Sequence, residues 1–420
     1  MPQQIDHDAT DEQLYADLPD PVILKPADLL SDYQPNILAP LVRCSKLPFR
    51  HLTSLYETHI THTPMILAEE FSRAQVARIS DFSTSLDERG VFWMEKKKSR
   101  KGKEAEHERE GHSYSHPEDD RPRQLQTQDG SDHFDDTGRL PRRLPPTPVR
   151  PSANHDLVRG CMIAQFASPN PTSLADAAEL ISPHVDGLDL NCGCPQRWAY
   201  NEGIGCALLR KPELVRDMVR CVKDRMGWEW PVSIKIRVDP ELKLTEQLIK
   251  TALQANISHL TIHGRTRHQS SADPVNLDGI KFAVETVNGQ VPCSGNGDIW
   301  ELNDAVIMRE TTGVSGVMGA RGLLANPALF AGYKTTPSHC VSQFISLSSS
   351  YGLIHPLFHR HLAYMLESQF SRAEKIWFNS LGGPVGAIDW LESRGLGWRK
   401  QSERGTIWDA RRGRAVVQAI

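Results

Sequence analysis

Eight short runs of apolar and β-branched residues alternate with amphipathic helical patterns between residues 36 and 335, and this alternation constrains the fold most strongly. The runs, which we predict to be strands, span residues 36–40, 64–67, 162–166, 187–190, 232–236, 259–262, 291–294 and 316–318. Eight strand–helix units predict an α/β fold, a (β/α)8 TIM barrel. A doubly wound parallel sheet is the alternative, and it is disfavoured because no G-x-G-x-x-G follows the first strand.

Changes in composition along the chain indicate its domain organisation. Residues 1–35 are polar and punctuated by proline, which predicts an N-terminal arm, and residues 36–335 carry the barrel pattern. Residues 336–395 lose the strand pattern and contain helical sequences such as SQFISLSSSYGLI, which predicts a small appended C-terminal helical domain, with a tail at 396–420. Residues 336–420 hold 10 Lys and Arg against 6 Asp and Glu, whereas the whole chain has a net charge of −4. This local excess of positive charge matters if the barrel acts on a polyanion.

A segment at 91–160 interrupts the barrel pattern between the second and third predicted strands. Its middle is dominated by charged and polar residues, opening with KKKSRKGK and closing with RRLPPTPVRP. Such a segment buries too little apolar area to offset its chain entropy, so we predict a disordered insert. Its removal would join a helix to the third strand through a short loop at the bottom of the barrel. The basic opening fits a nuclear-localisation or RNA-contacting patch, although a solvated charge run is the commoner meaning.

The composition excludes several classes of protein. Hydrophobic residues make up 39% and charged residues 24%, as in soluble globular chains, and no run approaches the length of a membrane span. The start, MPQQIDHDATDEQ, has no signal-peptide pattern, and the eight scattered cysteines include no C-x-x-C pair. We therefore expect reduced thiols, no membrane partner and a cytoplasmic protein, with the nucleus as a second location.

Polar residues follow nearly every predicted strand. Barrel enzymes place their catalytic groups at the C-terminal ends of the strands. Taken singly, each such residue has an ordinary structural reading, but together they predict a binding rim. The rim residues are Pro40, Glu69, Gln165, Asn191, Lys235, His263, Asn296, Gly297, Asp298 and Arg321.

The sequences SGNGD and GARG follow the last two strands, where barrels commonly bind phosphate. Gly295 and Gly297 permit a close approach of the backbone to an anion, and Arg321 adds a forked cationic donor. Glycines in such loops are otherwise simply turn residues.

Two cysteines lie in NCGCP, directly after the fourth strand. Cys192 and Cys194 are too few ligands for zinc, and we expect no metal site. A thiol with the ordinary pKa of about 8.5 is mostly protonated at neutral pH, so Cys194 is suited to donate a proton as a general acid. A buried, inert cysteine is the alternative for Cys194, and Cys192 is expected to be structural.

These motifs together resemble those of the tRNA-dihydrouridine synthases, most closely the eukaryotic class that reduces the D-loop uridines 20a and 20b. The resemblance covers about 35–90 and 160–395, and the 91–160 insert departs from the family pattern. It is carried by NILAPLVRCSKLPFR, TPMILAEEF, DGLDLNCGCPQRWAYNEGIGCALLR, SIKIRV, TIHGRTRHQ, SGNGDI, GVMGARGLLANPALF, FHRHLAYMLE and FNSL.

The resemblance implies an FMN-dependent reduction of uridine in tRNA by NADPH or NADH. It implies that a flavin hydride reaches C6 of the uracil while Cys194 protonates C5. The implied cofactor-binding residues are Pro40, Leu41, Val42, Gln165, Lys235, His263, Asn296, Gly297, Asp298, Ala320 and Arg321. The implied tRNA-binding residues are Asn191, Arg265, His359, Arg360 and Arg372. We expect the protein to be a monomer.

Two other functions compete with this one. An FMN barrel acting on a free pyrimidine, as in dihydroorotate oxidation, would use the same flavin residues, but it needs neither an RNA-docking helical domain nor the NCGCPQ loop. A flavin- or RNA-binding protein without activity is the second rival, with folding disrupted by the 91–160 insert.

Overall fold

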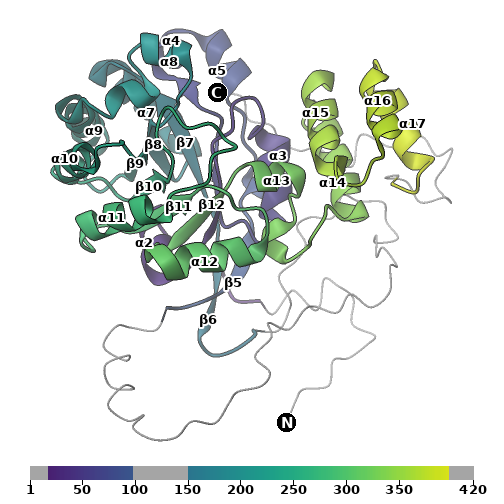
Figure 1. The fold of residues 1–420 in the computed structure, drawn as a ribbon, viewed down its shortest axis with the longest axis horizontal. Coiled ribbons are helices and arrows are strands. Elements are labelled where there is room, and N and C mark those ends of the chain that lie inside the picture. The colour runs from purple at the N-terminus through teal and green to yellow at the C-terminus, as the bar shows by residue number, and fades with distance from the viewer. Residues whose placement is uncertain (1–17, 98–149, 397–420) are drawn as a thin grey trace, which may run out of the picture.

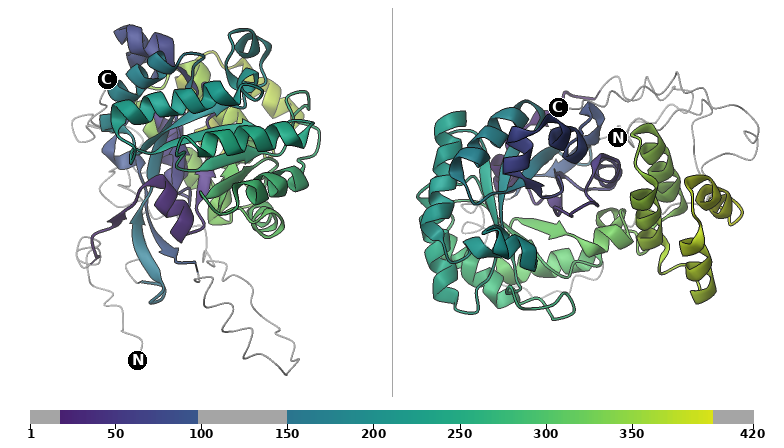
Figure 2. Two further views of the ribbon diagram at one scale, coloured as in Figure 1. Left: turned by 90° about the vertical axis from the view of Figure 1, so that its left-hand side faces the viewer. Right: turned by 90° about the horizontal axis from the view of Figure 1, so that it is seen from above.

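The computed structural model describes residues 18–97 and 150–396. Within these residues, eight parallel strands close into a barrel, because the last strand pairs with the first through Leu38 and Gly319. The barrel strands are β2 (Asn36–Leu38), β3 (Ile60–His62), β7 (Cys161–Ala167), β8 (Gly187–Cys192), β9 (Val232–Arg237), β10 (Leu260–His263), β11 (Cys293–Asn296) and β12 (Gly316–Gly319). Helices surround the strands in both views of Figure 2. The predicted TIM barrel is therefore confirmed.

The second barrel strand differs from its prediction. The sequence pattern placed it at 64–67, but β3 lies earlier, and Ile66–Leu67 forms only the short strand β4 against the upper end of β7. Pro64 separates the two pieces and has no N–H with which to continue the ladder. The β3 sequence ITH escaped prediction because its Thr and His side chains are buried, although they are polar.

The outer helices have the expected one-sided apolar pattern. In α9 (Pro212–Met226) the buried residues recur at helical spacing, at Val215, Met218, Val219 and Val222. The side chain of Asn170 accepts hydrogen bonds at the start of α7 (Pro171–Ile181), which fixes where that helix begins. The other helices of this layer are α3 (Leu47–Ser54), α4 (Ala68–Arg73), α5 (Gln75–Asp81), α8 (Arg197–Asn201), α10 (Leu242–Leu253), α11 (Leu277–Val287), α12 (Leu302–Thr312) and α13 (Arg321–Ala325), with the 3-10 turns Leu86–Glu88, Ser182–His184, Gly205–Leu208 and Leu329–Ala331.

The end of the barrel where the strands begin is covered by a small sheet. In the described part of the chain this sheet has the order β1 (Val22–Ile23), β6 (His155–Arg159), β5 (Val91–Glu95), and it packs beside α2 (Pro26–Asp32). Phe92, Met94 and Val158 are buried in one cluster with Leu29 and Leu30. β5 and β6 form an antiparallel pair that projects below the barrel in Figure 1.

This sheet corrects two of the boundaries drawn from the sequence. Both ends of the 91–160 segment are ordered strands, so the prediction of disorder is wrong there, while residues 98–149 lie outside the described residues. Likewise, Leu29, Leu30 and Tyr33 of the predicted N-terminal arm are buried, so that part of the arm belongs to the barrel. In both places a short alternating or helical pattern was diluted by the polar tracts next to it.

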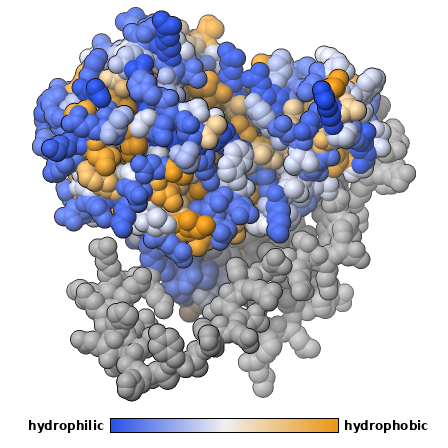
Figure 3. Space-filling view, in the orientation of Figure 1, coloured by the Kyte–Doolittle hydropathy of each residue, from blue (hydrophilic) through white to orange (hydrophobic). Residues whose placement is uncertain are grey.

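The expected helical region follows the barrel and consists of α14 (Ser338–Ser350), α15 (His355–Leu366), α16 (Arg372–Ser380) and α17 (Pro384–Glu392). It is attached through α3: His361 stacks on Phe49 with ring centroids 4.5 Å apart, and Tyr351 is hydrogen-bonded to His51 at 2.8 Å. It stands at one side of the barrel in Figure 1, and Figure 3 shows a surface in which hydrophilic residues surround scattered apolar ones. Among the described helices, none is long and apolar enough to cross a membrane. Residues 397–420, most of the predicted tail, lie outside the described residues.

Candidate active site at the C-terminal rim of the barrel

A chain of buried polar side chains links the ends of three neighbouring strands. Ser233 on β9 and Gln165 on β7 each donate a hydrogen bond to Asp189 on β8, both at 2.7 Å. Asn191 in turn donates to Gln165 at 2.7 Å. Burial raises the pKa of Asp189, while these two donors stabilise its charged form. The chain therefore fixes the orientation of the Gln165 and Asn191 amides at the rim, as expected for two site residues.

Asn191 also holds the loop that carries Cys194. Its side-chain oxygen accepts from the backbone N–H groups of Gly193 and Cys194, at 3.0 and 2.9 Å. The Cys194 thiol is half-buried, and burial raises its pKa, so it stays protonated at neutral pH. Cys192 lies fully buried within β8, consistent with the structural role expected for it.

The loop around Cys194 leaves no room for a side chain at position 205, which packs against it. Gly205 has a positive φ of 62°, and a Cβ there would lie 2.7 Å from the Cβ of Cys194. The backbone N–H of Cys206 donates to the carbonyl of Cys194 at 3.0 Å. Only glycine fits position 205, so the position of Cys194 is set by its neighbours on both sides.

Two basic side chains lie close to the middle of the barrel mouth. Lys235 donates to the side-chain oxygen of Asn296 at 2.9 Å, and Asn296 donates to the carbonyl of Met318 at 2.9 Å. Burial lowers the pKa of Lys235, and Arg237 lowers it further. Burial also lowers the pKa of His263, with added repulsion from Lys235 and other cations, so the imidazole is neutral. A neutral imidazole and an ammonium group are both available as hydrogen-bond donors.

A pocket of about 190 Å³ opens between the ends of β10, β11 and β12. Gly297 has a φ of 132° and a Cβ there would lie 2.6 Å from Val275, so this turn requires glycine. The pocket is lined by Arg237, His263, Arg265, Ser271, Asn296, Gly297, Asp298, Ile299, Trp300, Met318, Ala320, Arg321 and Gly322. Six of these are predicted cofactor-binding residues, which the structure thus brings together: His263, Asn296, Gly297, Asp298, Ala320 and Arg321.

The arginines of this pocket are held by one carboxylate. Asp298 accepts from Arg265 at 2.5 Å, from Arg321 at 3.0 Å and from the backbone N–H of Val275 at 3.1 Å. A carboxylate repels a phosphate, so we assign the Asp298 side chain to positioning the two guanidinium groups. Arg265 is only 2% exposed and also donates to the carbonyl of Asp273. We expected Arg265 to contact tRNA, but its side chain is buried in the pocket wall instead.

The loop after β2 lies beside this pocket. Ala39 donates its backbone N–H to Gly319 at 2.9 Å, so the loops that follow β2 and β12 are neighbours. Leu41 and Ala320 pack against the same apolar cluster, and Val42 is 55% exposed. Pro40, Leu41 and Val42 thus offer an apolar edge next to the polar pocket.

The three tail residues expected to bind tRNA are not part of the rim. Arg372 is exposed at the start of α16, and Arg360 is exposed on α15. His359 lies on Phe378 with ring centroids 4.4 Å apart and forms a hydrogen bond with the carbonyl of that residue at 2.8 Å. The His359 ring is therefore used for packing within the helical domain.

Sequence reasoning missed Arg237. This side chain donates to the carbonyl of Gly193 and to that of Thr266, both at 2.9 Å, and so joins the Cys194 loop to the loop after β10. The signal was present in SIKIRV, because residues two apart on a strand point to the same face, and Lys235 was already a candidate. Trp300, which lies under the guanidinium of Arg321 at 5.0 Å, was also missed.

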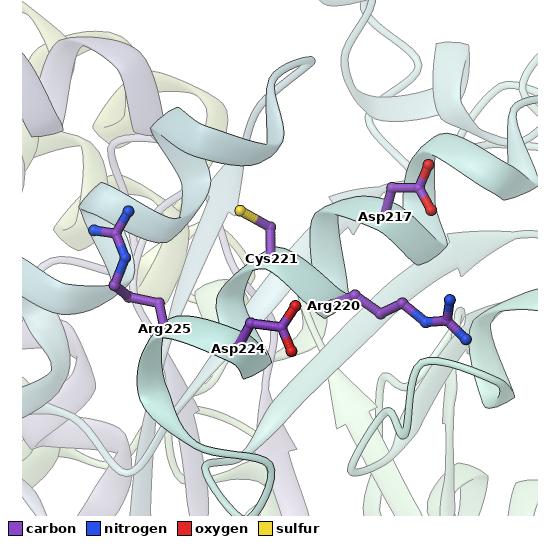
Figure 4. Close-up of a pocket in the computed structure, with 5 residues that line it drawn as sticks. All are labelled: Asp217, Arg220, Cys221, Asp224 and Arg225. Atoms are coloured by element: carbon purple, nitrogen blue, oxygen red, sulfur yellow. The ribbon is translucent and has the colours of Figure 1, made fainter.

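A second hollow lies on the outside of the barrel, far from the strand ends. It has a volume of about 490 Å³ and is lined by Asp217, Arg220, Cys221, Asp224 and Arg225. Figure 4 shows that all five side chains come from one helix, α9. No part of the barrel rim contributes to this depression, and in the described residues no group of three or more His, Cys, Asp or Glu could hold a metal.

The fold and the rim together define a class of protein. Barrels of this architecture bind phosphorylated ligands after their seventh and eighth strands, which are β11 and β12 here. The arginines and the required glycine lie at that place, and a protonated thiol lies across the mouth from them. The chain is thus a (β/α)8-barrel protein with an arginine-lined pocket at the place where barrels of this kind hold phosphate.

Comparison with known proteins gives the particular family. The family model described as "Dihydrouridine synthase (Dus)" matches residues 149–379, and the chain belongs to this family. The matched region contains every predicted site residue except Pro40, Leu41, Val42 and Glu69.

Several curated relatives are similar over most of this chain. A mouse protein named tRNA-dihydrouridine(20a/20b) synthase [NAD(P)+]-like is 37% identical over 360 residues, covering 85% of this chain and 87% of its own. The tRNA-dihydrouridine(20a/20b) synthase [NAD(P)+] of Schizosaccharomyces pombe is 35% identical, with coverages of 85% and 86%. The protein of the same name from Saccharomyces cerevisiae is 33% identical, with coverages of 85% and 78%.

Proposed function

We propose that this protein reduces uridine to 5,6-dihydrouridine in the D-loop of tRNA, at positions 20a and 20b, with NADPH or NADH as reductant. The names of its relatives support the reaction, the tRNA substrate and the nucleotide reductant. The observation in this chain that carries the proposal is Cys194. A protonated thiol lies at the barrel rim, fixed by Asn191 and opposite an arginine-lined pocket.

The rim fits FMN as the cofactor. FMN has a single phosphate, and the pocket between β11 and β12 presents Arg321 next to the turn of Gly297, where backbone can approach an anion closely. Asn296 and Ala320 would complete this phosphate site, and Asp298 would hold Arg321 in place there. Gln165, Lys235 and His263 would donate hydrogen bonds to the flavin ring, and Pro40, Leu41 and Val42 would contact its apolar part. When bound, FMN supplies the hydride that C6 of uracil receives.

Cys194 provides the proton. Addition of a hydride at C6 leaves negative charge at C5 and its neighbouring carbonyl, so C5 must take a proton to give dihydrouracil. The thiol donates this proton, and the thiolate that remains is stabilised by Arg237 and by the backbone N–H of Gln196. Arg237 therefore supports the chemistry from the loop side. Asn191, which holds the backbone of Cys194, would position the substrate base beside the thiol.

The substrate accounts for the helical domain. A uracil in folded tRNA must leave its stack to reach the rim, which costs a few kcal/mol, and contacts with the RNA backbone must offset this. Arg360 and Arg372 are exposed cations on the helical domain and are our candidates for such contacts. A free pyrimidine would need none of them, so the rival function on a free base is disfavoured.

Substitution of the two cysteines tests the proposal. Cys194→Ala should leave binding of FMN and reduction of the flavin by NADPH nearly intact, because neither uses the thiol. Transfer to tRNA uridine should slow by roughly 10²–10⁴-fold, as for a lost general acid. The matched control is Cys192→Ala, which should be much milder because Cys192 is buried in β8.

The assay is single-turnover reoxidation of the reduced protein by unmodified tRNA, with dihydrouridine mapped in the product. Equal rates for wild type and Cys194→Ala would eliminate the role of the thiol. Reduction of free uracil or orotate at the tRNA rate would favour the rival function. Bound FAD in place of FMN would overturn the cofactor assignment.

We also propose that the protein is a monomer of the cytoplasm, with a nuclear pool as the alternative. Light scattering of the purified chain tests the first point, and microscopy of a tagged full-length chain tests the second.

A further inference from the structure

Arg267 occupies a distinctive position on the rim. It lies in the loop between β10 and α11, two residues after Arg265, and its guanidinium carbon is 3.3 Å from the centroid of the Tyr200 ring. Tyr200 belongs to α8, which directly follows the Cys194 loop. The pair thus spans the gap between the two loops that Arg237 also joins through its hydrogen bonds with Gly193 and Thr266.

The donors of Arg267 are free, unlike those of four other arginines at the rim. Arg237 donates to two carbonyls, Arg265 and Arg321 share Asp298, and Arg210 forms two hydrogen bonds with Asp239. In the described part of the chain, no carboxylate or carbonyl oxygen accepts a hydrogen bond from Arg267. Its observed partner is an aromatic face, which attracts the guanidinium group and leaves its N–H edge open.

The location of this free cation is on the Cys194 side of the mouth. The charge of Arg267 lowers the pKa of Cys206, whose backbone N–H donates to Cys194, so the guanidinium lies close to that loop. Arg267 is not among the residues that line the pocket assigned to the FMN phosphate. The neighbouring rings of Trp198 and Tyr200 are 46% and 40% exposed, as expected where RNA bases are met by aromatic side chains.

We propose that Arg267, held flat by Tyr200, binds a phosphodiester of the tRNA strand that brings the target uridine to Cys194; this inference rests on the proposed function. A planar guanidinium binds phosphate through two parallel hydrogen bonds, and an edge that is already oriented loses less conformational freedom on binding. The strand that carries an extruded base must pass over the rim next to the thiol. Arg267 is a rim cation that an aromatic ring orients while its donors stay open within the described residues.

Salt-dependent binding of unmodified tRNA tests this contact without relying on turnover. Arg267→Gln should weaken tRNA binding about tenfold at low salt, the size of one lost charge-assisted contact. The slope of log Kd against log salt should fall by roughly 0.7–0.9, because one phosphate contact is lost. Arg220→Gln is the matched control, since Arg220 is an exposed cation on the outer face of α9 (Figure 4).

Variants at Tyr200 separate the charge from its placement. Tyr200→Phe keeps a ring under the guanidinium and should bind tRNA as wild type does. Tyr200→Leu should weaken binding while leaving the salt slope unchanged, because the charge is still present. FMN content and flavin reduction by NADPH should match wild type in every variant, which also verifies folding.

The outcomes distinguish this contact from the proposed reaction. An unchanged affinity and salt slope in Arg267→Gln would overturn the contact even if wild type makes dihydrouridine. A raised KM for NADPH with normal tRNA binding would assign Arg267 to the reductant's phosphate and would likewise overturn it. A wild-type protein that binds tRNA with the predicted charge dependence but makes no dihydrouridine would refute the reaction and leave the contact standing.

Discussion

Phe92 is the side chain that most directly tests whether the β5–β6 pair belongs to the folded barrel. It is 5% exposed, and its ring meets that of His59 edge to face at 4.6 Å. The ring also covers two glycines: a Cβ at Gly90 would lie 2.3 Å from it and one at Gly160 3.1 Å. Phe92→Ala therefore leaves a cavity against backbone that has no side chains to fill it.

The expected loss of stability is about 3–5 kcal/mol, the usual range for a buried Phe→Ala change. That is a large part of the roughly 5–15 kcal/mol that stabilises a typical domain. Equilibrium unfolding in urea, followed by circular dichroism, measures the difference. Glu95→Ala is the control on the same strand, because Glu95 is exposed and should change stability by less than about 0.5 kcal/mol. A loss below about 1 kcal/mol in Phe92→Ala would refute the reasoning and show that the segment is dispensable.

Three further predictions concern buried charge, pH and the anion pocket. Glu88→Gln should destabilise the protein by about 3–5 kcal/mol in the same assay, because it leaves the guanidinium of Arg50, 2% exposed and 2.6 Å from Glu88, without its partner charge; a loss under 1 kcal/mol would contradict this. Acidification from pH 7 to 5.5 should lower the melting temperature, because burial depresses the pKa of several histidines and the unfolded chain therefore binds more protons in this range. Each of these histidines lowers the free energy of unfolding by about 1.3 kcal/mol over this interval. Asp189, whose pKa is raised, offsets part of this loss. The histidines are His62, His259, His263 and His361, with pKa values of about 3, 4, 2 and 4. A melting temperature that is constant or rises on acidification would be inconsistent with their burial. Gly322→Ala should weaken FMN binding at least tenfold, because its Cβ would lie 2.0 Å from the Ile299 carbonyl and displace the start of α13; calorimetric titration measures this, with Gly382→Ala, where a Cβ meets nothing, as control.

The barrel was predictable because most of its strands can be recognised from the local pattern of apolar residues in the sequence. The strand β7 is buried on both faces and forms a nearly continuous apolar run, whereas β9 alternates apolar and polar residues in VSIKIR. The strand β3 lacked that signal because Thr61 and His62 are polar, although both are buried. The sheet below the barrel was missed for another reason: β5 and β6 are far apart in the sequence, and only their pairing buries Phe92 and Val158.

The rim was predictable for its members but not for their contacts. Parallel strands end at one face, so Gln165, Asn191 and Lys235 could be placed there from the strand count alone. Which side chain meets which depends on loops that only the closed barrel brings together. Arg265 is buried against Asp298, and His359 packs on Phe378, because of contacts between segments that are not adjacent in the sequence.

Closure of the barrel has a consequence for synthesis of the chain. The strand β2 is among the first parts to be made, but its outer hydrogen-bonding partner, β12, is among the last of the barrel, with Leu38 paired to Gly319. At 5–20 residues per second, a ribosome needs roughly 15–60 s to add the chain between them. During that time the edge of β2 stays open to pairing with other strands, which is how nascent chains aggregate. One face of α3 stays exposed as well, because the helical region that packs on it is made only after the barrel is complete. A nascent chain of this protein therefore keeps one strand edge unpaired until β12 has emerged.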